Sequence, residues 1–451
     1  SGQYWLYGAE PRFRQAVAAA AAYASAMLND SAGALLNLEW LRRESQRAER
    51  IKTGIDPEAL RTTKLATLLR DAALGRSTPG DDQSILDLRS QNHLASSAES
   101  TKPAIEDIRR AMAAIPSDTV LLIFLPLPTQ DGFIVWRMET AGSIPGAAAG
   151  PVAKVSIIPC PMYQFNRAAK TLLALVVNRE GGWMSPSQQL YKFLFSRLDP
   201  IPPGKTLAIW LAGSQPIPFE LLGPDPERIF LRSNPIVYLT DLAATPMPAQ
   251  KPARRAAVLI THPGEALTGV ARESREIARI LQLPEQSVLD PSAAEAPTIL
   301  SGSRIVHIAA HSVIDQRNPL RSYIALRDGH LEAWQLLGGG QNADLIVLSA
   351  CSTRRGAERV LSDDSTSISS LVELGGARTV LSSLGPADDG RSADLMIDFY
   401  DLLNGRPALA LFQARQRSLA RHLNPVQVAN FVLSARDVES LGVSFPSAQN
   451  K

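Results

Sequence analysis

The stretches "IVHIAAHSV", residues 305–313, and "ADLIVLSACST", residues 343–353, carry the pattern that decides the fold. Each is a short run of apolar and β-branched residues, typical of a buried strand. The first ends at His311 and the second at Cys351. Reactive groups in an open parallel sheet gather beyond the carboxyl ends of the strands. If these strands are neighbours, an imidazole and a thiol lie close together, as a Cys/His dyad requires.

Strands of this kind alternate with helices from residue 255 onward. Further strands are predicted at residues 255–262, 322–331 and 377–384, and helices at residues 268–281, 365–374, 391–403 and 407–423. Such alternation produces βαβ units and a mostly parallel sheet with helices on both faces. The sequence therefore predicts an α/β fold for this part of the chain.

Residues 118–242 show a similar succession of predicted strands and helices. Strands are predicted at residues 118–126, 132–139, 153–159 and 205–211, helices at 166–177 and 185–198, and extended chain at 228–242. The proline-rich "TPMPAQKPARR", residues 245–255, predicts a linker between the two parts.

Residues 1–115 are interpreted as a helical region, interrupted by a polar stretch from Gly75 to Pro103 that is typical of a long loop or a disordered insertion. The opening "SGQYW" is interpreted as a remnant of a removed tag or as a trimmed start. The chain has 451 residues, enough for two or three domains.

Composition excludes several functional classes. A formal net charge of +2 gives no reason to propose nucleic acid as a direct partner. The longest apolar runs have the length of strands, so no membrane span is predicted. Two cysteines, Cys160 and Cys351, cannot form a disulfide framework, which favours a reducing, cytoplasmic compartment.

The residues at the two strand ends leave alternatives open. Most free cysteines are small buried apolar residues, and Cys351 fits that description as well. His307 and His311 share strand parity, but "HIAAH" lacks the glutamate of the zinc-protease pattern and has no evident third ligand, so no metal is predicted. His307 is interpreted as a packed histidine that supports His311. The glycine-rich "LLGGGQNAD" follows a helix and lacks nucleotide-binding spacing, so no cofactor is predicted.

Several blocks, in this order and spacing, resemble the CHAT peptidases, caspase-like cysteine proteases of clan CD that are related to caspases and separase. The blocks are "HIAAHS", "SYIALRDGHLEAWQLL", "ADLIVLSACST", "GGARTVLSSLGPADD" and "LMIDFYDLL", with "QQLYKFLF" and "KTLAIWLAGSQPIPFELLG" upstream. The resemblance implies a caspase-like sheet in two halves. It implies a helical region at residues 1–115, a non-catalytic half at 116–250 and a catalytic half at 251–451.

The resemblance also implies the roles of individual residues. Cys351 corresponds to the nucleophile and His311 to the base, with the backbone N–H groups of Ser312 and Cys351 as the oxyanion hole. Ser312 stands where the family usually has glycine. Its N–H is nevertheless retained. Gly385 stands where relatives often carry tryptophan, which suggests a more open pocket wall.

Substrate preference is inferred from the loop "PADDG". Asp389 lies where separase has an acidic pocket residue, and together with Asp388 and, more weakly, Ser349 it implies cleavage after Arg or Lys. The alternative is that both aspartates cap the helix that follows. Arg354, Arg355 and Arg359, in the loop after the cysteine, are candidate self-cleavage positions.

The sequence therefore predicts a cysteine endopeptidase acting on a protein or peptide substrate. An activating protein partner through the helical region is expected, and regulated bacterial defence or cell death is the setting that the family suggests. The alternative is a catalytically silent scaffold or sensor that binds a protein partner.

Overall fold

A computed structural model provides the fold. It describes residues 33, 35–37, 39, 105–127, 131–140, 151–211, 217–242, 255–262, 268–315, 322–337, 343–354 and 367–445. The first 104 residues are therefore represented only by five helical positions, and most of the predicted N-terminal helical region lies outside the described residues. So do the polar stretch and all but the last residue of the linker.

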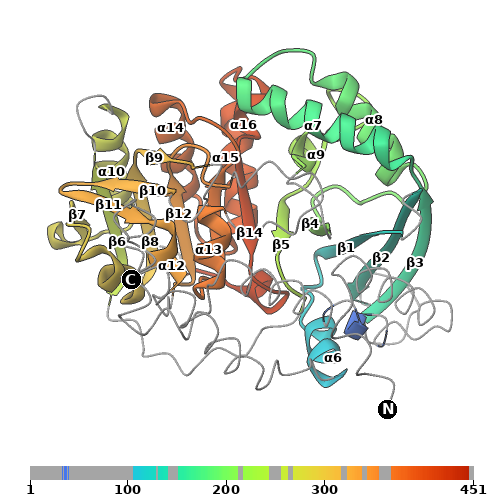
Figure 1. Ribbon diagram of the computed structural model, residues 1–451, viewed down its shortest axis with the longest axis horizontal. Helices are drawn as coiled ribbons and strands as arrows, with labels where there is room; N and C mark the ends of the chain where they lie inside the picture. The colour runs from blue at the N-terminus through green and yellow to red at the C-terminus, as the bar shows by residue number, and fades with distance from the viewer. Residues whose placement is uncertain are drawn as a thin grey trace, which may run out of the picture.

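The centre of the molecule is an 11-stranded sheet (Figure 1). The strand order is β3 (Pro151–Pro159), β2 (Gly132–Thr140), β1 (Thr119–Pro126), β4 (Thr206–Leu211), β5 (Ile236–Leu239), β14 (Phe431–Ala435), β13 (Thr379–Ser383), β12 (Leu345–Ser349), β8 (Ser303–Ala310), β6 (Arg255–His262) and β7 (Val288–Leu289). Neighbours are parallel except for the β1–β2, β2–β3 and β13–β14 pairs. The predicted mostly parallel α/β sheet is confirmed.

Side chains alternate between the two faces of the sheet, and helices cover both. In β12, Leu345 and Val347 face one core and Ile346 and Leu348 face another. The first core is covered by α6 (Ile105–Ala113), α10 (Thr268–Ile280), α14 (Asp389–Asp401) and α15 (Pro407–Ala420). The second is covered by α11 (Ala296–Ser301), α12 (Ala333–Leu337) and α13 (Ile368–Leu374).

A third core lies on the face of the first part of the sheet opposite α6. It is covered by α7 (Met162–Asn178) and α8 (Met184–Phe195), with α16 (Pro425–Val428) from the end of the chain (Figure 1). A short 3₁₀ helix, η3 (Phe219–Leu221), packs in the same core. Aromatic rings such as Phe124, Phe133 and Phe165 fill it.

Several elements differ from the sequence prediction. Residues 228–242 were expected to be extended, but Phe230–Ser233 form the short helix α9 before β5. Strand β14 was not predicted at all, and it lies between β5 and β13. The sheet therefore runs continuously from the first part into the second. The division into halves at residues 116–250 and 251–451 stays a prediction.

A small three-stranded sheet lies between β8 and β12 in the sequence. It consists of β9 (Ser312–Val313), β10 (Tyr323–Leu326) and β11 (Gly329–Glu332), in the order β11-β10-β9. Together with α12 it provides the crossover that returns the chain to the parallel neighbour of β8. None of the described helices has the length and apolar character that crossing a membrane requires.

Candidate active site

His311 and Cys351 follow two adjacent parallel strands. β8 and β12 pair in parallel, with Ala309 opposite Ser349. Each chain then advances two residues, so the same register leads to His311 on one strand and to Cys351 on the other. The expectation that these strands are neighbours is confirmed. Both residues therefore lie at the carboxyl edge of the sheet, where reactive groups of such sheets gather.

The turn that carries the thiol is held by the end of β13. The hydroxyl of Ser383 donates to the carbonyl oxygen of Ala350 at 2.6 Å. The N–H of Ser352 donates to the carbonyl oxygen of Gly385 at 3.0 Å, and Ser352 has a positive φ of 55°. A residue other than glycine in this conformation is uncommon. These contacts fix the chain on both sides of Cys351.

A backbone donor points at the sulfur itself. The N–H of Ala387 lies 3.4 Å from Sγ of Cys351, which is partly exposed. This donor forms a hydrogen bond with the sulfur and so fixes its position relative to the loop after β13. The sequence did not point to this contact, because Ala387 has no reactive side chain.

The segment after β8 contacts the thiol turn. The hydroxyl of Ser312 donates a short hydrogen bond to the carbonyl oxygen of Cys351. The N–H of Ala325 donates to the carbonyl oxygen of His311 at 2.8 Å. This bond makes Ser312 and Ile324 a non-hydrogen-bonded pair of the β9–β10 ladder. The N–H of Ser312 is thus directed away from β10.

The imidazole of His311 is exposed. His311 and Cys351 both lie among the described residues, and no hydrogen bond joins the imidazole to the thiol there. Catalytic hydrogen bonds often tighten only when substrate is bound. The register of β8 and β12 therefore brings His311 and Cys351 to the same edge of the sheet, without a hydrogen bond between their side chains.

His307 belongs to a buried polar group beneath the edge. It is fully buried, and its Nε2 lies 3.0 Å from Oε1 of Glu273 on α10. The ring of Tyr400 on α14 meets it edge-on, with centroids 5.5 Å apart. Burial, together with the nearby Glu273 carboxylate, raises the pKa of Tyr400 well above its usual value. These contacts join β8 to the helices that cover it.

Asp388 and Asp389 make separate contacts at the start of α14. The carboxylate of Asp388 caps the helix by accepting from the N–H of Arg391 at 3.1 Å. Oδ2 of Asp389 accepts from the N–H of Gly269, at the start of α10, at 2.5 Å. Asp388 thus caps α14, as the alternative interpretation predicted for both aspartates. Asp389 instead accepts from the backbone at the start of α10. Ser349 is partly buried at the end of β12.

Arg354, three residues after the thiol, is anchored inside the molecule. Its Nη1 lies 3.2 Å from Oε1 of Glu373, and its guanidinium lies 5.6 Å from the centre of the Tyr238 ring. Its side chain is 14% exposed, which leaves it poorly presented as a cleavage position in this conformation. Arg355 and Arg359 lie outside the described residues.

Gly385 does not leave an open wall. A Cβ at this position would lie 2.8 Å from Cα of Val177 on α7 and 3.3 Å from Oδ1 of Asn430. The space that a larger residue would need is therefore filled by α7, and the expectation of a more open wall was wrong at this point.

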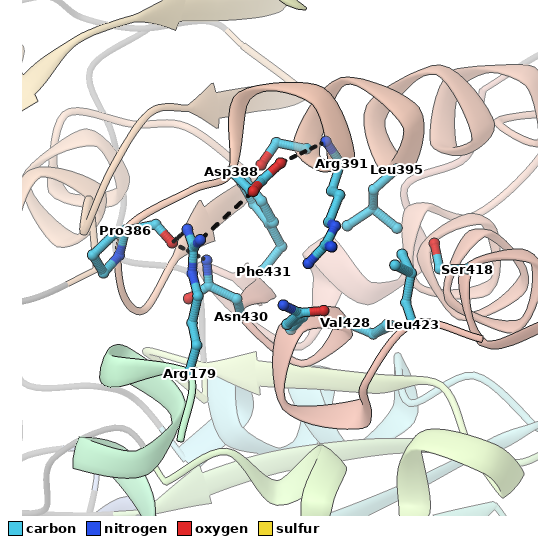
Figure 2. Close-up of a pocket in the computed structure, with 12 residues that line it drawn as sticks. Arg179, Pro386, Asp388, Arg391, Leu395, Ser418, Leu423, Val428, Asn430 and Phe431 are labelled. Carbon is cyan, nitrogen blue, oxygen red and sulfur yellow. Dashed lines mark hydrogen bonds and ion pairs between the residues drawn. The ribbon is translucent and has the colours of Figure 1, made fainter. Parts of the chain in front are cut away.

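A pocket with an open volume of about 450 Å³ lies beneath the loop from Gly385 to Asp388. Figure 2 shows Arg179 and Asn430 converging on Pro386 at its edge, and neither residue was singled out from the sequence. Within the described residues, no group of three or more His, Cys, Asp or Glu side chains could hold a metal ion.

Comparison with known proteins places this geometry in context. Residues 185–431 match the family model described as the CHAT domain. No curated protein matches the sequence significantly. A solved structure with a similar fold is that of the separase–securin complex from Saccharomyces cerevisiae, with a TM-score of 0.50 and 10% identity. The match covers 90% of this chain and 36% of that one, so this chain spans about a third of the length of the separase chain.

A weaker likeness is found to the Arg-specific cysteine proteinase gingipain R. The TM-score is 0.37 and the identity 9%, covering 58% of this chain and 69% of that one. A complex of the pro- and mature domains of RgpB from Porphyromonas gingivalis gives a TM-score of 0.36 and 8% identity, covering 62% and 76%.

Proposed function

The chain belongs to the CHAT domain family, with a caspase-like fold similar to that of separase, and from this premise we propose that it is a cysteine endopeptidase with Cys351 as nucleophile and His311 as base. The observation that carries the proposal is the register of β8 and β12, which brings these two residues to the same edge of the sheet. The N–H of Ala387 on the sulfur adds to it, because this hydrogen bond holds the partly exposed sulfur at that edge.

The proposed reaction begins when His311 removes the thiol proton and Sγ of Cys351 attacks the scissile carbonyl carbon. The N–H groups of Ser312 and Cys351 stabilise the resulting oxyanion. When the intermediate collapses, the C–N bond breaks, the protonated imidazole gives its proton to the leaving amine, and a thioester remains. Water then attacks the thioester with His311 as base, which releases the acid and restores the thiol.

The proposal is tested with variants of the whole chain. Cys351→Ala should lose peptide hydrolysis by about 10⁴-fold or more, as for the loss of other catalytic nucleophiles, and His311→Ala should lose most of it. Cys160→Ala is the matched control, because Cys160 is a buried cysteine remote from the edge in sequence. A peptide chloromethyl ketone ending in Arg should label Cys351 in the parent but not in His311→Ala. Activity of Cys351→Ala near that of the parent would refute the assignment.

We propose that cleavage follows Arg or Lys, with Asp389 facing the basic side chain and Asp388 and Ser349 nearby. Ala387, between these aspartates and Pro386, contacts the sulfur, which supports a short path from the thiol to both carboxylates. The contact of Asp389 with Gly269 uses one of its two oxygens, and the second remains for a ligand.

Asp389→Asn separates this role from a structural one. For a substrate-binding carboxylate, kcat/KM for an Arg substrate should fall about 100-fold, in line with the loss of a charged hydrogen bond. The value for a Leu substrate should stay nearly constant. An equal fall for both substrates, together with a lower unfolding midpoint, would assign Asp389 to the α10–α14 contact alone.

We also propose that a protein partner regulates the activity through the N-terminal helical region, in a reducing bacterial cytoplasm and in a defence or cell-death setting. Securin accompanies separase in the similar structure, and the chain folds with helix α6 against the first part of the sheet. Activity that appears only after addition of a co-purifying protein, and that fails in a chain lacking residues 1–104, would support this regulation.

A catalytically silent scaffold is the second candidate. It is favoured by Ser312 at the glycine position and by the lack of a hydrogen bond between His311 and Cys351, both of which are described residues. Failure of the chloromethyl ketone to label Cys351, with and without a partner, would favour the scaffold.

A further inference from the structure

The loop between β13 and α14 touches the thiol turn twice. Gly385 accepts from the N–H of Ser352 through its carbonyl oxygen at 3.0 Å. Two residues later, the N–H of Ala387 donates to Sγ of Cys351 at 3.4 Å. Pro386 lies between them and contributes only a carbonyl oxygen, because proline has no N–H. The position of the Ala387 donor therefore depends on the peptide group that joins Pro386 to Ala387.

The side chain of Asn430, in the segment between α16 and β14, forms two hydrogen bonds with this loop. Its Oδ1 accepts from the N–H of Gly385 at 2.8 Å, and its Nδ2 donates to the carbonyl oxygen of Pro386 at 3.1 Å. The residue is 7% exposed. The amide accepts from an N–H and donates to a carbonyl at the same time, whereas a carboxylate has no donor, so an aspartate of equal size could make only the first bond.

The side chain of Arg179, from the first part of the chain, forms a hydrogen bond with the same carbonyl oxygen. It ends α7 in the left-handed conformation, with φ of 58°. Its Nη2 donates to the carbonyl oxygen of Pro386 at 2.8 Å, and its Nη1 lies 3.7 Å from Oδ2 of Asp388. Figure 2 shows Arg179 and Asn430 meeting at this oxygen. The two residues are far apart in the sequence but meet at this oxygen.

The geometry of a trans peptide connects the hydrogen bonds on the Pro386 oxygen with the direction of the Ala387 N–H. The structure contains no cis peptide bond among its described residues, and in a planar trans peptide the carbonyl and the N–H point in opposite directions. Holding the Pro386 oxygen between Arg179 and Asn430 therefore aims the Ala387 N–H at the opposite side, where Sγ of Cys351 lies. The cationic guanidinium also polarises the peptide group and strengthens its N–H as a donor.

We propose that Arg179 and Asn430 are positioning residues that fix the Pro386–Ala387 peptide group and so set the donor on the Cys351 sulfur. Neither side chain contacts the sulfur. The consequence for peptide hydrolysis rests on the proposed function, whereas the consequence for the reactivity of the thiol does not. The first part of the chain, through α7, thereby contributes directly to a site built on the second.

The test measures alkylation of Cys351 by iodoacetamide from pH 5 to 10 in the full chain, with mass mapping of the labelled cysteine. In Arg179→Ala, the pH midpoint of alkylation should move to a higher value, and the rate at neutral pH should fall about 10-fold, since less thiolate forms without an aimed donor. Asn430→Asp should do the same, and Arg179→Lys should recover part of the rate. Arg167→Ala removes an exposed arginine from the same helix and should leave the profile unchanged.

Peptide hydrolysis provides the second readout. In Arg179→Ala, kcat should fall between about 10- and 100-fold with KM nearly constant, as a small misplacement of reacting groups does elsewhere. Circular dichroism and the unfolding midpoint check the fold, and Arg179, whose side chain is 32% exposed, carries the test if Asn430→Asp does not fold.

An alkylation profile of Arg179→Ala identical to that of the parent would overturn the proposal, and so would an equal shift in Arg167→Ala. If the parent hydrolyses no peptide, the proposed function fails, but the alkylation profiles still decide the role of Arg179 and Asn430.

Discussion

The two cysteines of the chain occupy opposite kinds of surroundings. Cys160, after β3, is fully buried, and desolvation raises the pKa of its thiol to about 12. Cys351 is partly exposed and has a backbone N–H on its sulfur. Reactivity follows the thiolate and its accessibility, so these residues should behave differently although both are free.

We predict that iodoacetamide at pH 8 modifies Cys351 but not Cys160 in the folded chain. Cys160 stays protonated at this pH because its pKa lies near 12, and it is inaccessible because it is fully buried. Peptide mapping by mass spectrometry checks the outcome, and unfolding in guanidinium before labelling should expose both cysteines equally. Modification of Cys160 at a comparable rate in the folded chain would contradict the burial described here.

Gly385 lies where the backbone leaves no room for a Cβ atom. An added Cβ would lie 2.8 Å from the backbone of Val177, so Gly385→Ala must displace the loop that reaches Cys351. We expect kcat to fall at least about 10-fold by misplacement. Gly390→Ala is the matched control, since its Cβ would meet no atom nearer than 3.9 Å, and its activity should be close to that of the parent. Equal activities of the two variants would show that the loop adapts freely.

At the scale of elements, a buried ion pair joins α15 to η3. Arg415 and Glu220 are 1% and 0% exposed, and their charged groups lie 2.8 Å apart. Arg415 also donates to the carbonyl oxygen of Phe431 on β14 at 2.5 Å, and the hydroxyl of Tyr238 lies 2.6 Å from Oε2 of Glu220. This cluster joins η3 and β5 of the first part of the chain to α15 and β14 of the second.

Arg415→Met should therefore lower the free energy of unfolding by about 3–5 kcal/mol, because it leaves the Glu220 charge buried without its partner. Adding Glu220→Gln should recover part of this loss. Arg417→Met removes an arginine of the same helix that is 43% exposed, and its cost should stay within about 1 kcal/mol. Guanidinium unfolding of the four proteins, parent included, measures these differences. A cost for Arg415→Met equal to that for Arg417→Met would contradict the expectation.

The elements themselves were largely predictable. The buried run in β12 and the amphipathic pattern of α10 depend on neighbours in the sequence, and both formed as expected. Strand β14 was missed because "FVLSA" begins only two residues after a short proline-led helix, which leaves no clear boundary between helix and strand in the sequence. Its place between β5 and β13 depends on residues far away in the chain.

For the whole molecule, one sheet and one shared core cross the expected boundary at residue 250. β14 pairs with β5 on one side and with β13 on the other. We predict that residues 1–250 and 251–451, produced separately, do not fold stably, because each exposes an unpaired strand edge and half of a core. Production of both fragments together should restore a soluble complex. Size-exclusion chromatography and circular dichroism check this, and cooperative unfolding of either fragment alone would support independent halves.

Stability of the whole molecule should also decline at alkaline pH. Burial raises the pKa of Cys160 from 9.0 to about 12, and it raises the pKa of Tyr238 and Tyr400 well above 10.0. These groups bind protons more tightly in the folded state than in the unfolded state. Their contribution to the free energy of unfolding is therefore complete below pH 9 and is lost as pH rises toward 12. The free energy of unfolding should fall from pH 9 to 11, with a shallower slope in Tyr400→Phe. A slope unchanged by that substitution would assign the decline to other groups.

The sequence by itself determined the α/β class, the strands that end at His311 and Cys351, and the aspartates at the start of a helix, because the periodicity and the end signals of an element are local. Tertiary structure decided what no local pattern encodes. It placed β14 in the middle of the sheet, directed Asp389 to α10 and brought Arg179 and Asn430 to one carbonyl oxygen. Arg179 and Pro386 are 207 residues apart. Contacts over such distances arise only when the whole molecule packs, since the packing of the three cores against the sheet, and not the sequence near either residue, sets the position of both.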